Sequence, residues 1–347
     1  MNMPARQPVS IVRWWLPPRA ALKNLRATMG ILRDSRAVSR IRFLRAAERV
    51  GLIQKLRTPS TAEELARVLN ISDVGLLREL LDVGASVGEL RSRDGRYSTK
   101  GSRVRALASE GGEALSAFTG ELADYRGDVY RDLPAQLFGG ERGHYLDEYD
   151  ELVARASRLL EPFIARFVRE IVTRRAPRTL LEIGCGTGIY VRHAAEACPQ
   201  LSAVGIDISE RVSALAGANF TSWGLANRCT ALHADIRQPD TAQLDGPFDM
   251  VTLHNNVYYF SAPERASLFA DLRRRLAPGG RLVVTSVFAG KELAAAEFDL
   301  VLRATAGCWP LPKRNELLDE LKHAGFSAIE FHRLAAPPLY GVVADAP

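Results

Sequence analysis

The stretch that decides the fold is TLLEIGCGTGIYVRHAAEACPQLSAVGIDIS, residues 179–209. A short apolar strand leads through a turn into a helix pattern, and the turn holds three glycines spaced G-x-G-x-G, Gly184, Gly186 and Gly188. The next apolar strand ends in Asp207. Glycines at such a turn let the backbone approach a nucleotide closely, and a carboxylate at the end of the second strand can accept both ribose hydroxyl groups. The stretch therefore predicts a site for an adenosine group.

Two residues distinguish this turn from that of dinucleotide-binding enzymes. Those enzymes have the spacing G-x-G-x-x-G, and Ile189 occupies the position of their third glycine. Glu182 lies within the preceding strand, where a buried carboxylate is costly unless a cationic or hydrogen-bonding ligand uses it. We therefore expect a ligand other than a dinucleotide, with such a group near Glu182.

From Pro177 onward the chain alternates between short apolar strands and helices. Seven strands are expected, TLLEIG, LSAVGID, CTALHAD, FDMVTLH, RLVVTSVF, FSAIEFHRL and LYGVVADA. This alternation predicts an α/β fold with a doubly wound, Rossmann-like sheet that is parallel through the fifth strand. The last two strands are joined through Pro337-Pro338 without a helix, so we expect an antiparallel hairpin at the edge of the sheet.

Three helix patterns and a β-hairpin pattern cover residues 41–105. Thr61 and Glu64 have the spacing of a capping box, and Asp94-Gly95 is a hairpin turn signal. This order predicts a winged helix in a mainly helical domain. The third helix is unsuited to enter a groove of DNA, because it carries three acidic residues and one basic residue and would face a polyanion. These residues are Asp73, Glu79, Asp82 and Arg78. We therefore expect this module to pack against a partner subunit and not to bind nucleic acid.

Two further segments are the first 40 residues and a helical connector, residues 106–175. After Pro18 the first segment has apolar residues at helical spacing and a basic opposite face, the apolar positions being Leu22, Leu25, Met29 and Leu32. Such a helix packs on its own protein or on a second copy, or it lies on an anionic membrane surface. In the connector, helical spacing from Leu152 to Phe167 predicts a helix that joins the two ends and covers the site. The expected domains are residues 1–40, 41–105, 106–175 and 176–347.

Composition and charge limit the function classes. The chain has 347 residues, 47% hydrophobic and 25% charged, which is typical of a globular protein of about two domains and excludes disorder. Through Arg57, thirteen basic residues face two acidic ones, so the net charge of +6 divides into +11 there and −5 in the remaining 290 residues. Without an apolar run of about 18 residues or a signal peptide, we expect a cytoplasmic protein. The four cysteines and six histidines lack metal-binding spacing, so we expect reduced thiols and no metal site.

The segment from residue 176 resembles the seven-stranded class I S-adenosylmethionine-dependent methyltransferases. LLEIGCGTG resembles their first motif, GID their second-strand acid, ADI the motif after their third strand, and LAPGGRLVV the segment that enters their fifth strand. The resemblance implies that the glycine turn lines the methionine and ribose parts of the cofactor, with Gly184, Cys185, Gly186 and Gly188. It further implies that Asp207 binds the ribose, that Asp235 and the Ile236 backbone bind adenine, and that Glu182 supports the ammonium end.

The N-terminal half resembles the winged-helix dimerisation domain of small-molecule O-methyltransferases, the group that includes the acetylserotonin and hydroxyneurosporene types. TAEELARVLN, LLRELLDVGASVGEL and GRYSTKG match that pattern in order. The resemblance covers roughly residues 41–347 and implies a homodimer with S-adenosyl-L-methionine as cofactor.

A base near the end of the fourth strand must remove the proton of a hydroxyl nucleophile. In the resembling O-methyltransferases it is a histidine, and an ungapped alignment from Phe248 to the proline-glycine-glycine turn puts Tyr258 at its position. A neutral tyrosine is a poor base at pH 7. His254, at the strand's end, is the second candidate for the catalytic role, or else it flanks the cofactor.

The polar run HNNVYYF, residues 254–260, has two readings. In one, five side chains line the junction between cofactor and substrate, His254, Asn255, Asn256, Tyr258 and Tyr259. In the other, the apolar members belong to the core and the polar ones are helix caps. Residues 291–312 likewise form either an apolar substrate wall or core, through Phe298, Leu302, Cys308 and Trp309.

The leading hypothesis is a homodimeric methyltransferase acting on a small apolar or aromatic molecule of secondary metabolism. O-methylation is favoured, and a carbon or nitrogen nucleophile is an alternative that would suit the missing histidine. Two other hypotheses remain. One is a methyltransferase of nucleic acid or protein, anchored by the basic N-terminal segment, and the other is a cofactor-binding protein without turnover.

Overall fold

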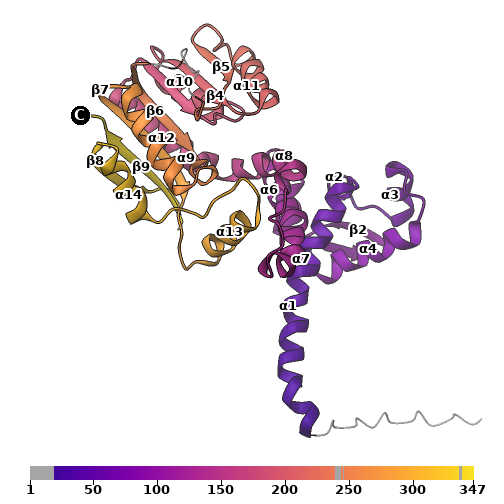
Figure 1. Ribbon diagram of the computed structural model, residues 1–347. Helices are drawn as coiled ribbons and strands as arrows, with labels where there is room; N and C mark the ends of the chain where they lie inside the picture. Colours follow the sequence, from indigo (N-terminus) through magenta and orange to yellow (C-terminus); the bar gives the residue numbers. More distant parts are fainter. Residues whose placement is uncertain (1–18, 239–243, 245, 336–337) are drawn as a thin grey trace, which may run out of the picture. The chain divides into compact units, whose positions relative to one another are not determined.

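The computed structural model describes residues 19–238, 244, 246–335 and 338–347 (Figure 1). The chain divides into two compact units, residues 1–112 and 113–347. The observed boundary lies near the one expected at residue 105. The connector 106–175 is not a separate body, because its residues from 113 onward belong to the C-terminal unit and its last helix packs against the sheet.

The N-terminal unit contains helices and one hairpin in the predicted order. Its elements are α1 (Arg19–Arg49), α2 (Leu52–Lys55), α3 (Ala62–Leu69), α4 (Val74–Ser86), β1 (Leu90–Arg93), β2 (Arg96–Thr99) and α5 (Ser102–Leu107). The capping box is present, with the Glu64 N–H donating to Thr61 Oγ1 at 3.2 Å and the Thr61 N–H donating to Glu64 Oε2 at 2.9 Å. The hairpin turns at Asp94 and Gly95, both with positive φ. These local signals in the sequence therefore located their elements correctly.

Helix α1 differs from the expected division at residue 40, because it runs without interruption from the first segment into the second. Nothing in residues 19–49 stops a helix, since the stretch has no proline and Gly30 alone is tolerated within it. Leu25, Met29 and Leu32 are 43%, 62% and 65% exposed, so this apolar face is uncovered within the N-terminal unit. The side chain of Leu22 and all of residues 1–18 lie outside the described part of the chain.

The C-terminal unit begins with helices that lead to the sheet. They are α6 (Glu113–Gly120), a π-helical turn η1 (Glu121–Tyr125), α7 (Arg126–Leu137), α8 (Leu146–Ser157), a 3₁₀ turn η2 (Arg158–Leu160) and α9 (Glu161–Arg175). The single helix expected from Leu152 to Phe167 is wrong, because the 3₁₀ turn separates α8 from α9. Pro162, in the first turn of α9, lacks the N–H that a continuous helix would use.

The sheet has seven strands in the order β5-β4-β3-β6-β7-β9-β8. In chain order they are β3 (Thr179–Ile183), β4 (Ser202–Asp207), β5 (Cys229–His233), β6 (Phe248–His254), β7 (Leu276–Val287), β8 (Ser327–Arg333) and β9 (Leu339–Asp345). Strands β3 to β7 are parallel, and β9 pairs antiparallel with both β7 and β8. The predicted Rossmann-like α/β sheet with an antiparallel hairpin at its edge is confirmed.

The remaining helices are α10 (Ile189–Ala197), α11 (Glu210–Ser222), η4 (Val257–Tyr259), α12 (Ala262–Arg275), α13 (Leu293–Ala304) and α14 (Arg314–His323). Of these, α10, α11, α12 and α14 pack along the sheet, whereas α13 packs against α7. Leu181 and Val251 pack in the core with α12 and α14, whereas Leu180 and Met250 pack in the core with α9 and α10. Because side chains alternate along a strand, Glu182 and the even-numbered positions of β6 face α9 and α10.

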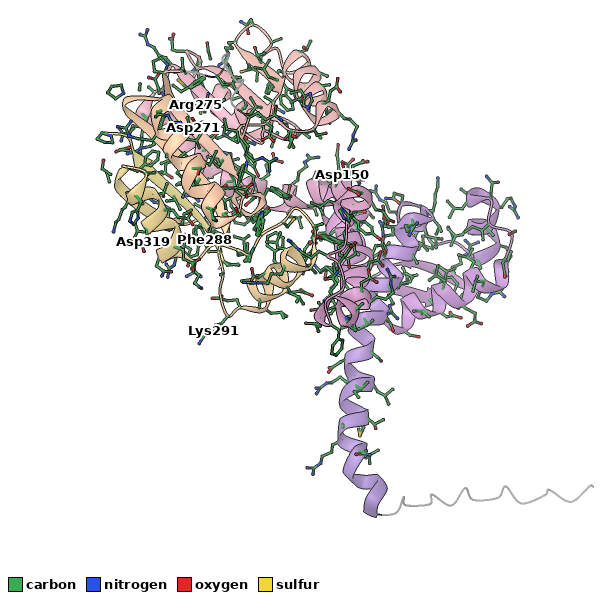
Figure 2. All side chains as sticks on the ribbon, viewed as in Figure 1. Asp150, Asp271, Arg275, Phe288, Lys291 and Asp319 are labelled. Atoms are coloured by element: carbon green, nitrogen blue, oxygen red, sulfur yellow. The ribbon has the colours of Figure 1, made fainter. Side chains whose placement is uncertain are left out.

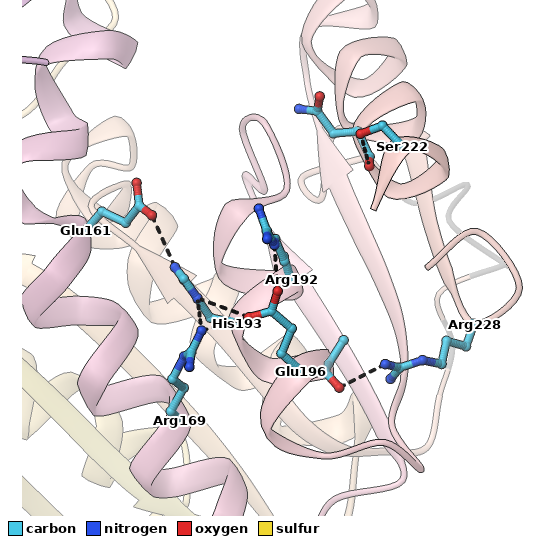
Figure 3. A network of polar contacts seen from close by, with 9 residues as sticks. Glu161, Arg169, Arg192, His193, Glu196, Ser222 and Arg228 are labelled. Atoms are coloured by element: carbon cyan, nitrogen blue, oxygen red, sulfur yellow. Dashed lines mark hydrogen bonds and ion pairs between the residues drawn. The ribbon is translucent and has the colours of Figure 1, made fainter. Parts of the chain in front are cut away.

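Polar contacts at the helix surfaces hold these layers in place. Figure 3 shows Glu161 and Arg169 of α9 on either side of His193 of α10, at 3.2 and 2.9 Å, with Arg169 also 2.7 Å from Glu196. On α12, Asp271 and Arg275 form an i,i+4 ion pair at 2.7 Å (Figure 2). Among the described helices, none is long and apolar enough to cross a membrane.

Candidate functional site

The glycine turn has a backbone that only glycine adopts readily. Gly184, Gly186 and Gly188 have φ angles of +63°, +55° and +79°, in the left-handed region. A Cβ atom on Gly188 would also lie 2.5 Å from the ring of Phe220, and one on Gly184 would lie 2.6 Å from Asn256 Nδ2. The turn therefore combines an uncommon backbone conformation with close packing. Because it follows β3, its N–H groups lie at the carboxyl edge of the sheet.

Asp207 lies against this turn, as the sequence predicted. Gly186 N–H donates to Asp207 Oδ2 and Ser209 N–H donates to Asp207 Oδ1, both at 3.0 Å. The two bonds fix the carboxylate at the end of β4, and each oxygen keeps lone pairs for further donors. The geometry suits a ligand with two adjacent hydroxyl groups.

Glu182 is 1% exposed, and its Oε1 atom makes no hydrogen bond within the described part of the chain. Desolvation by burial raises the pKa of this carboxyl group well above its ordinary value, and the nearby charge of Asp207 adds to the shift. A buried acceptor without a partner is costly, so a donor supplied by a ligand would remove that cost.

Asp235 and Ile236 follow the end of β5. The Asp235 carboxylate accepts three hydrogen bonds from the side chain of Arg237 and one from its backbone, at 2.9–3.1 Å. Burial opposes ionisation of Asp235, but these bonds prevail and lower its pKa. Ala234 N–H donates to Asp207 O at 3.0 Å, which ties the end of β5 to the end of β4. Asp235 therefore lies near the turn but shares its oxygens with Arg237, a partner that the sequence prediction did not include.

His254 is unsuited to act as a base. It is 6% exposed, its Nδ1 atom lies 2.9 Å from Thr285 Oγ1, and Nε2 has no partner among the described residues. Its ring packs against Tyr190 with the centroids 4.7 Å apart. Desolvation lowers the pKa of His254 to about 3, so the ring is neutral and a weak proton acceptor. The structure thus argues against the expected catalytic role, because the strand's end is buried under α10.

This buried histidine makes stability depend on pH. The folded pKa lies below the ordinary value of 6.5, so the stabilisation is present above pH 6.5 and is lost as the pH falls toward 3. Over the 1.5 units from pH 6.5 to 5, the wild type should lose about 2 kcal/mol that His254→Asn does not lose. Urea unfolding at pH 7.5 and pH 5 measures the difference. His323→Asn, which changes an exposed ring, should follow the wild type, and an equal acid loss in His254→Asn would contradict the assignment.

Tyr258 lies beyond the end of β6, in η4. It is 8% exposed, and desolvation together with Tyr259 raises its pKa well above 10, so its hydroxyl stays protonated. Trp309 N–H donates to the Tyr258 carbonyl oxygen at 2.7 Å, and the Phe298 ring meets the Tyr258 ring edge-on at 5.3 Å. Tyr258 can therefore position a neighbour or donate a hydrogen bond, but it is no base.

Two roles were expected for the segment 291–312, an apolar substrate wall and core packing, and its residues divide between them. Leu302 and Cys308 are 3% and 1% exposed and belong to the main core, whereas Phe298 is only partly buried and contacts Tyr258. Trp309 is 39% exposed. All four cysteines are unpaired and buried, and no group of three or more His, Cys, Asp or Glu in the described ranges is arranged to hold a metal ion.

Two asparagines follow β6 and connect its end to the neighbouring strands β7 and β3. Asn255 has a φ of +54°, its N–H donates to Thr285 O at 2.8 Å, and its Oδ1 atom lacks a partner in the described residues. Asn256 donates from Nδ2 to the carbonyl oxygen of Ile183, and its Oδ1 atom is likewise buried without a hydrogen bond there. The polar run at the strand's end signalled these residues, but the bond to Ile183 is a long-range contact that spacing does not reveal. Tyr190 was missed altogether, because it reads as an ordinary helix residue.

Comparisons with known proteins agree with this geometry. Residues 180–280 match the family model described as a methyltransferase domain, so this part of the chain is a methyltransferase domain. The trans-aconitate 2-methyltransferase of Deinococcus radiodurans is 32% identical over 120 residues, 35% of this chain and 42% of that protein. The nocamycin O-methyltransferase of Saccharothrix syringae is 32% identical over 123 residues, again 35% and 42%. The chain spans about a third to a half of the length of the curated relatives it matches.

Solved structures resemble the fold over nearly the whole chain. The mitomycin 7-O-methyltransferase MmcR has a TM-score of 0.79 at 17% identity, covering 94% of this chain and all of that one. The SAH-bound form of CalO1, a methyltransferase in calicheamicin biosynthesis, has a TM-score of 0.65 at 21% identity, covering 92% and 98%. At these identities the likeness establishes the shared fold.

Proposed function

We propose that the chain binds S-adenosyl-L-methionine and transfers its methyl group to a small apolar or aromatic molecule. The observation that carries the proposal is the glycine turn at residues 184–188, with the anchored Asp207 on one side and the buried Glu182 on the other. The match of residues 180–280 to methyltransferase domains supports the same ligand.

The residues present fit this cofactor. Asp207 would hold the ribose hydroxyl groups, the Asp235 carboxylate and the Ile236 backbone would meet adenine, and Glu182 with Asn255 would accept from the ammonium group. Gly184, Cys185, Gly186 and Gly188 would line the methionine and ribose parts of the ligand. When bound, the sulfonium supplies an activated methyl group, and the protein contributes alignment and exclusion of water.

Calorimetric titration with S-adenosylmethionine and with its demethylated product tests the proposal. Saturable binding of both compounds is expected, because Glu182 and Asp207 contact parts that the two share. If folded protein binds neither compound, the proposal is contradicted.

A small-molecule substrate is favoured over nucleic acid by the charges of α4. Asp73 accepts from Leu76 N–H as the helix cap, Asp82 accepts from the Tyr97 hydroxyl, and Arg78 is paired with Glu63. The one basic residue is therefore neutralised, and the helix presents no cationic face to a polyanion. The structural neighbours include by name a mitomycin 7-O-methyltransferase and a methyltransferase in calicheamicin biosynthesis, which supports a substrate from secondary metabolism.

Asn256 should contribute to binding of the amino-acid end. Asn256→Ala is expected to weaken binding of S-adenosylhomocysteine about tenfold or more, because its amide oxygen, which has no partner among the described residues, would accept from the ammonium group together with Glu182 and Asn255. Binding of 5′-methylthioadenosine, which lacks the amino-acid end, should change little. Calorimetry with both ligands measures the difference.

Asn219→Ala is the matched control for Asn256→Ala. Like Asn256, Asn219 donates a hydrogen bond from its side-chain amide to a backbone carbonyl oxygen, that of Thr187 in the turn, at 3.0 Å. Unlike Asn256, it is not among the described residues with a buried side-chain oxygen that lacks a partner. Equal losses for both ligands in Asn256→Ala would show that Asn256 only supports the turn.

We propose in addition that the chain is a homodimer in which the apolar face of α1 is covered by the second copy. Leu32→Asp should weaken dimerisation at least about tenfold, because it buries a carboxylate. Ala27→Asp, on the opposite side of the same helix, should leave association unchanged. Sedimentation equilibrium measures the association of both variants, and a monomeric wild type would contradict the proposal.

Contact of residues 1–40 with an anionic membrane is the alternative to a dimer, and vesicle sedimentation distinguishes the two. A cytoplasmic location remains a prediction.

A further inference from the structure

Neither of the two candidate bases at the end of β6, His254 and Tyr258, is suited to accept a substrate proton. Tyr258 stands where the resembling enzymes have a histidine, and burial keeps its hydroxyl protonated. His254 is buried against Tyr190 and Thr285, and the one side-chain hydrogen bond that it makes to a described residue goes to Thr285. An oxygen nucleophile would therefore need a base from another element.

The π-helical turn η1 presents a carboxylate on that side. It interrupts an otherwise continuous helix between α6 and α7, and its first residue is Glu121. Single π turns inside helices occur often at functional sites, because the wider turn redirects side chains. The Glu121 side chain is 12% exposed, so it is largely withdrawn from bulk water.

Arg126 holds Glu121 through one oxygen only. Its Nε and Nη2 atoms both donate to Glu121 Oε1, at 3.2 and 2.8 Å. Its Nη1 atom donates to Glu297 Oε2 of α13 at 2.5 Å. One guanidinium group thus serves two carboxylates, and Glu121 Oε2 has no hydrogen bond within the described part of the chain. The arrangement fixes the carboxylate and leaves one of its oxygens available.

Contacts connect this carboxylate to the residues around η4. Tyr125, at the end of the same turn, bonds through its hydroxyl to Thr305 Oγ1 at 2.8 Å. Cys308 N–H donates to Thr305 O, and the next residue, Trp309, donates to the carbonyl oxygen of Tyr258.

The charge of Glu121 reaches both tyrosines of η4. It is among the charges that raise the pKa values of Tyr258 and Tyr259, after desolvation and nearer groups. The charge of Asp207 acts on Tyr259 as well. Arg126 bonds to both Glu121 and Glu297 of α13, and the next residue of that helix, Phe298, contacts the Tyr258 ring, which places Glu121 close to η4.

We propose that Glu121 Oε2 is the proton acceptor for a hydroxyl substrate. In this step the substrate oxygen forms a bond to the methyl carbon, the carbon–sulfur bond breaks with its electron pair left on sulfur, and the hydroxyl proton moves to Oε2. The inference rests on the proposed function and adds the catalytic residue and the class of nucleophile. Arg126 and Glu297 act as positioning residues.

The test compares methyl transfer by the wild type, Glu121→Gln, Glu121→Ala and Glu297→Gln. The acceptors are a metabolite extract together with phenols and catechols, and the donor is methyl-labelled S-adenosylmethionine. Glu121→Gln should lower kcat by about 10²–10⁴-fold, the range for loss of a general base, and leave binding of S-adenosylhomocysteine unchanged. Added formate should restore part of the activity of Glu121→Ala, which a structural role would not allow.

Glu297→Gln is the matched control, because it removes the other carboxylate on the same arginine. It should cost less than about tenfold and show no formate rescue. Full activity of Glu121→Gln would overturn the inference. So would a loss of activity in Glu121→Ala that formate does not restore and that equals the loss in Glu297→Gln. Both results leave the proposed function in place. Absence of transfer by the wild type would contradict the proposed function and remove the inference with it.

Discussion

Replacement of Asp207 by alanine is expected to weaken binding of S-adenosylmethionine by at least about 100-fold. The carboxylate would lose two charged hydrogen bonds to the ribose, at about 1.5–3 kcal/mol each, and tenfold in affinity corresponds to about 1.4 kcal/mol. The variant also loses the bonds that Gly186 N–H and Ser209 N–H donate to Asp207, so the turn is less well fixed. Calorimetric titration of the wild type and the variant measures the change.

Asp249→Ala is the matched control for this experiment. Asp249 Oδ2 also accepts two backbone N–H bonds, from Arg178 at 2.7 Å and Thr179 at 3.1 Å, but at the opposite edge of the sheet. It should lower stability without a specific loss of affinity. Binding by Asp207→Ala within about fivefold of the wild type, or an equal loss in Asp249→Ala, would contradict the role given to Asp207.

Gly188→Ala is expected to lower the stability of the C-terminal unit by about 2–5 kcal/mol. Its φ of +79° is unfavourable for alanine by about 1–2 kcal/mol. The added Cβ also lies 2.5 Å from the fully buried ring of Phe220, and such overpacking costs about 1–3 kcal/mol. The unfolding midpoint should fall by on the order of 10 °C, as measured by thermal denaturation.

Gly186→Ala separates the cost of the positive φ angle from the cost of the clash with Phe220. Gly186 has a φ of +55° in the same turn, but no heavy atom of a neighbouring residue lies within 4 Å of the position that an added methyl group would take. It should therefore lose only the conformational part, about 1–2 kcal/mol. Equal destabilisation by the two substitutions would contradict the clash with Phe220.

The elements of the sheet could be predicted because their signals are local. Strands β3 to β6 coincide with short apolar runs, β7 begins at Leu276, ahead of the run RLVVTSVF, and the hairpin of β8 and β9 follows from the missing helix between them. The positions of Gly184 and Asp207 relative to one another follow from that topology, since parallel strands bring their carboxyl ends to one edge.

The other features depend on contacts between distant residues. The 3₁₀ turn before Pro162 and the π turn at Glu121 leave the apolar spacing almost unchanged, so periodicity does not reveal them. His254 looked available at a strand's end, but the packing of Tyr190 over it decides its protonation. Arg126 joins Glu121 to Glu297 of α13, a pairing that no spacing rule indicates.

Methyl transfer itself tests the central claim most directly. Purified chain is incubated with methyl-labelled S-adenosylmethionine and a metabolite extract, and the labelled products are identified by mass spectrometry. We expect label in a small apolar or aromatic product, and we expect the labelling to require Asp207 and Glu121. Label found only in nucleic acid or protein, or no transfer by a chain that binds the cofactor, would contradict it.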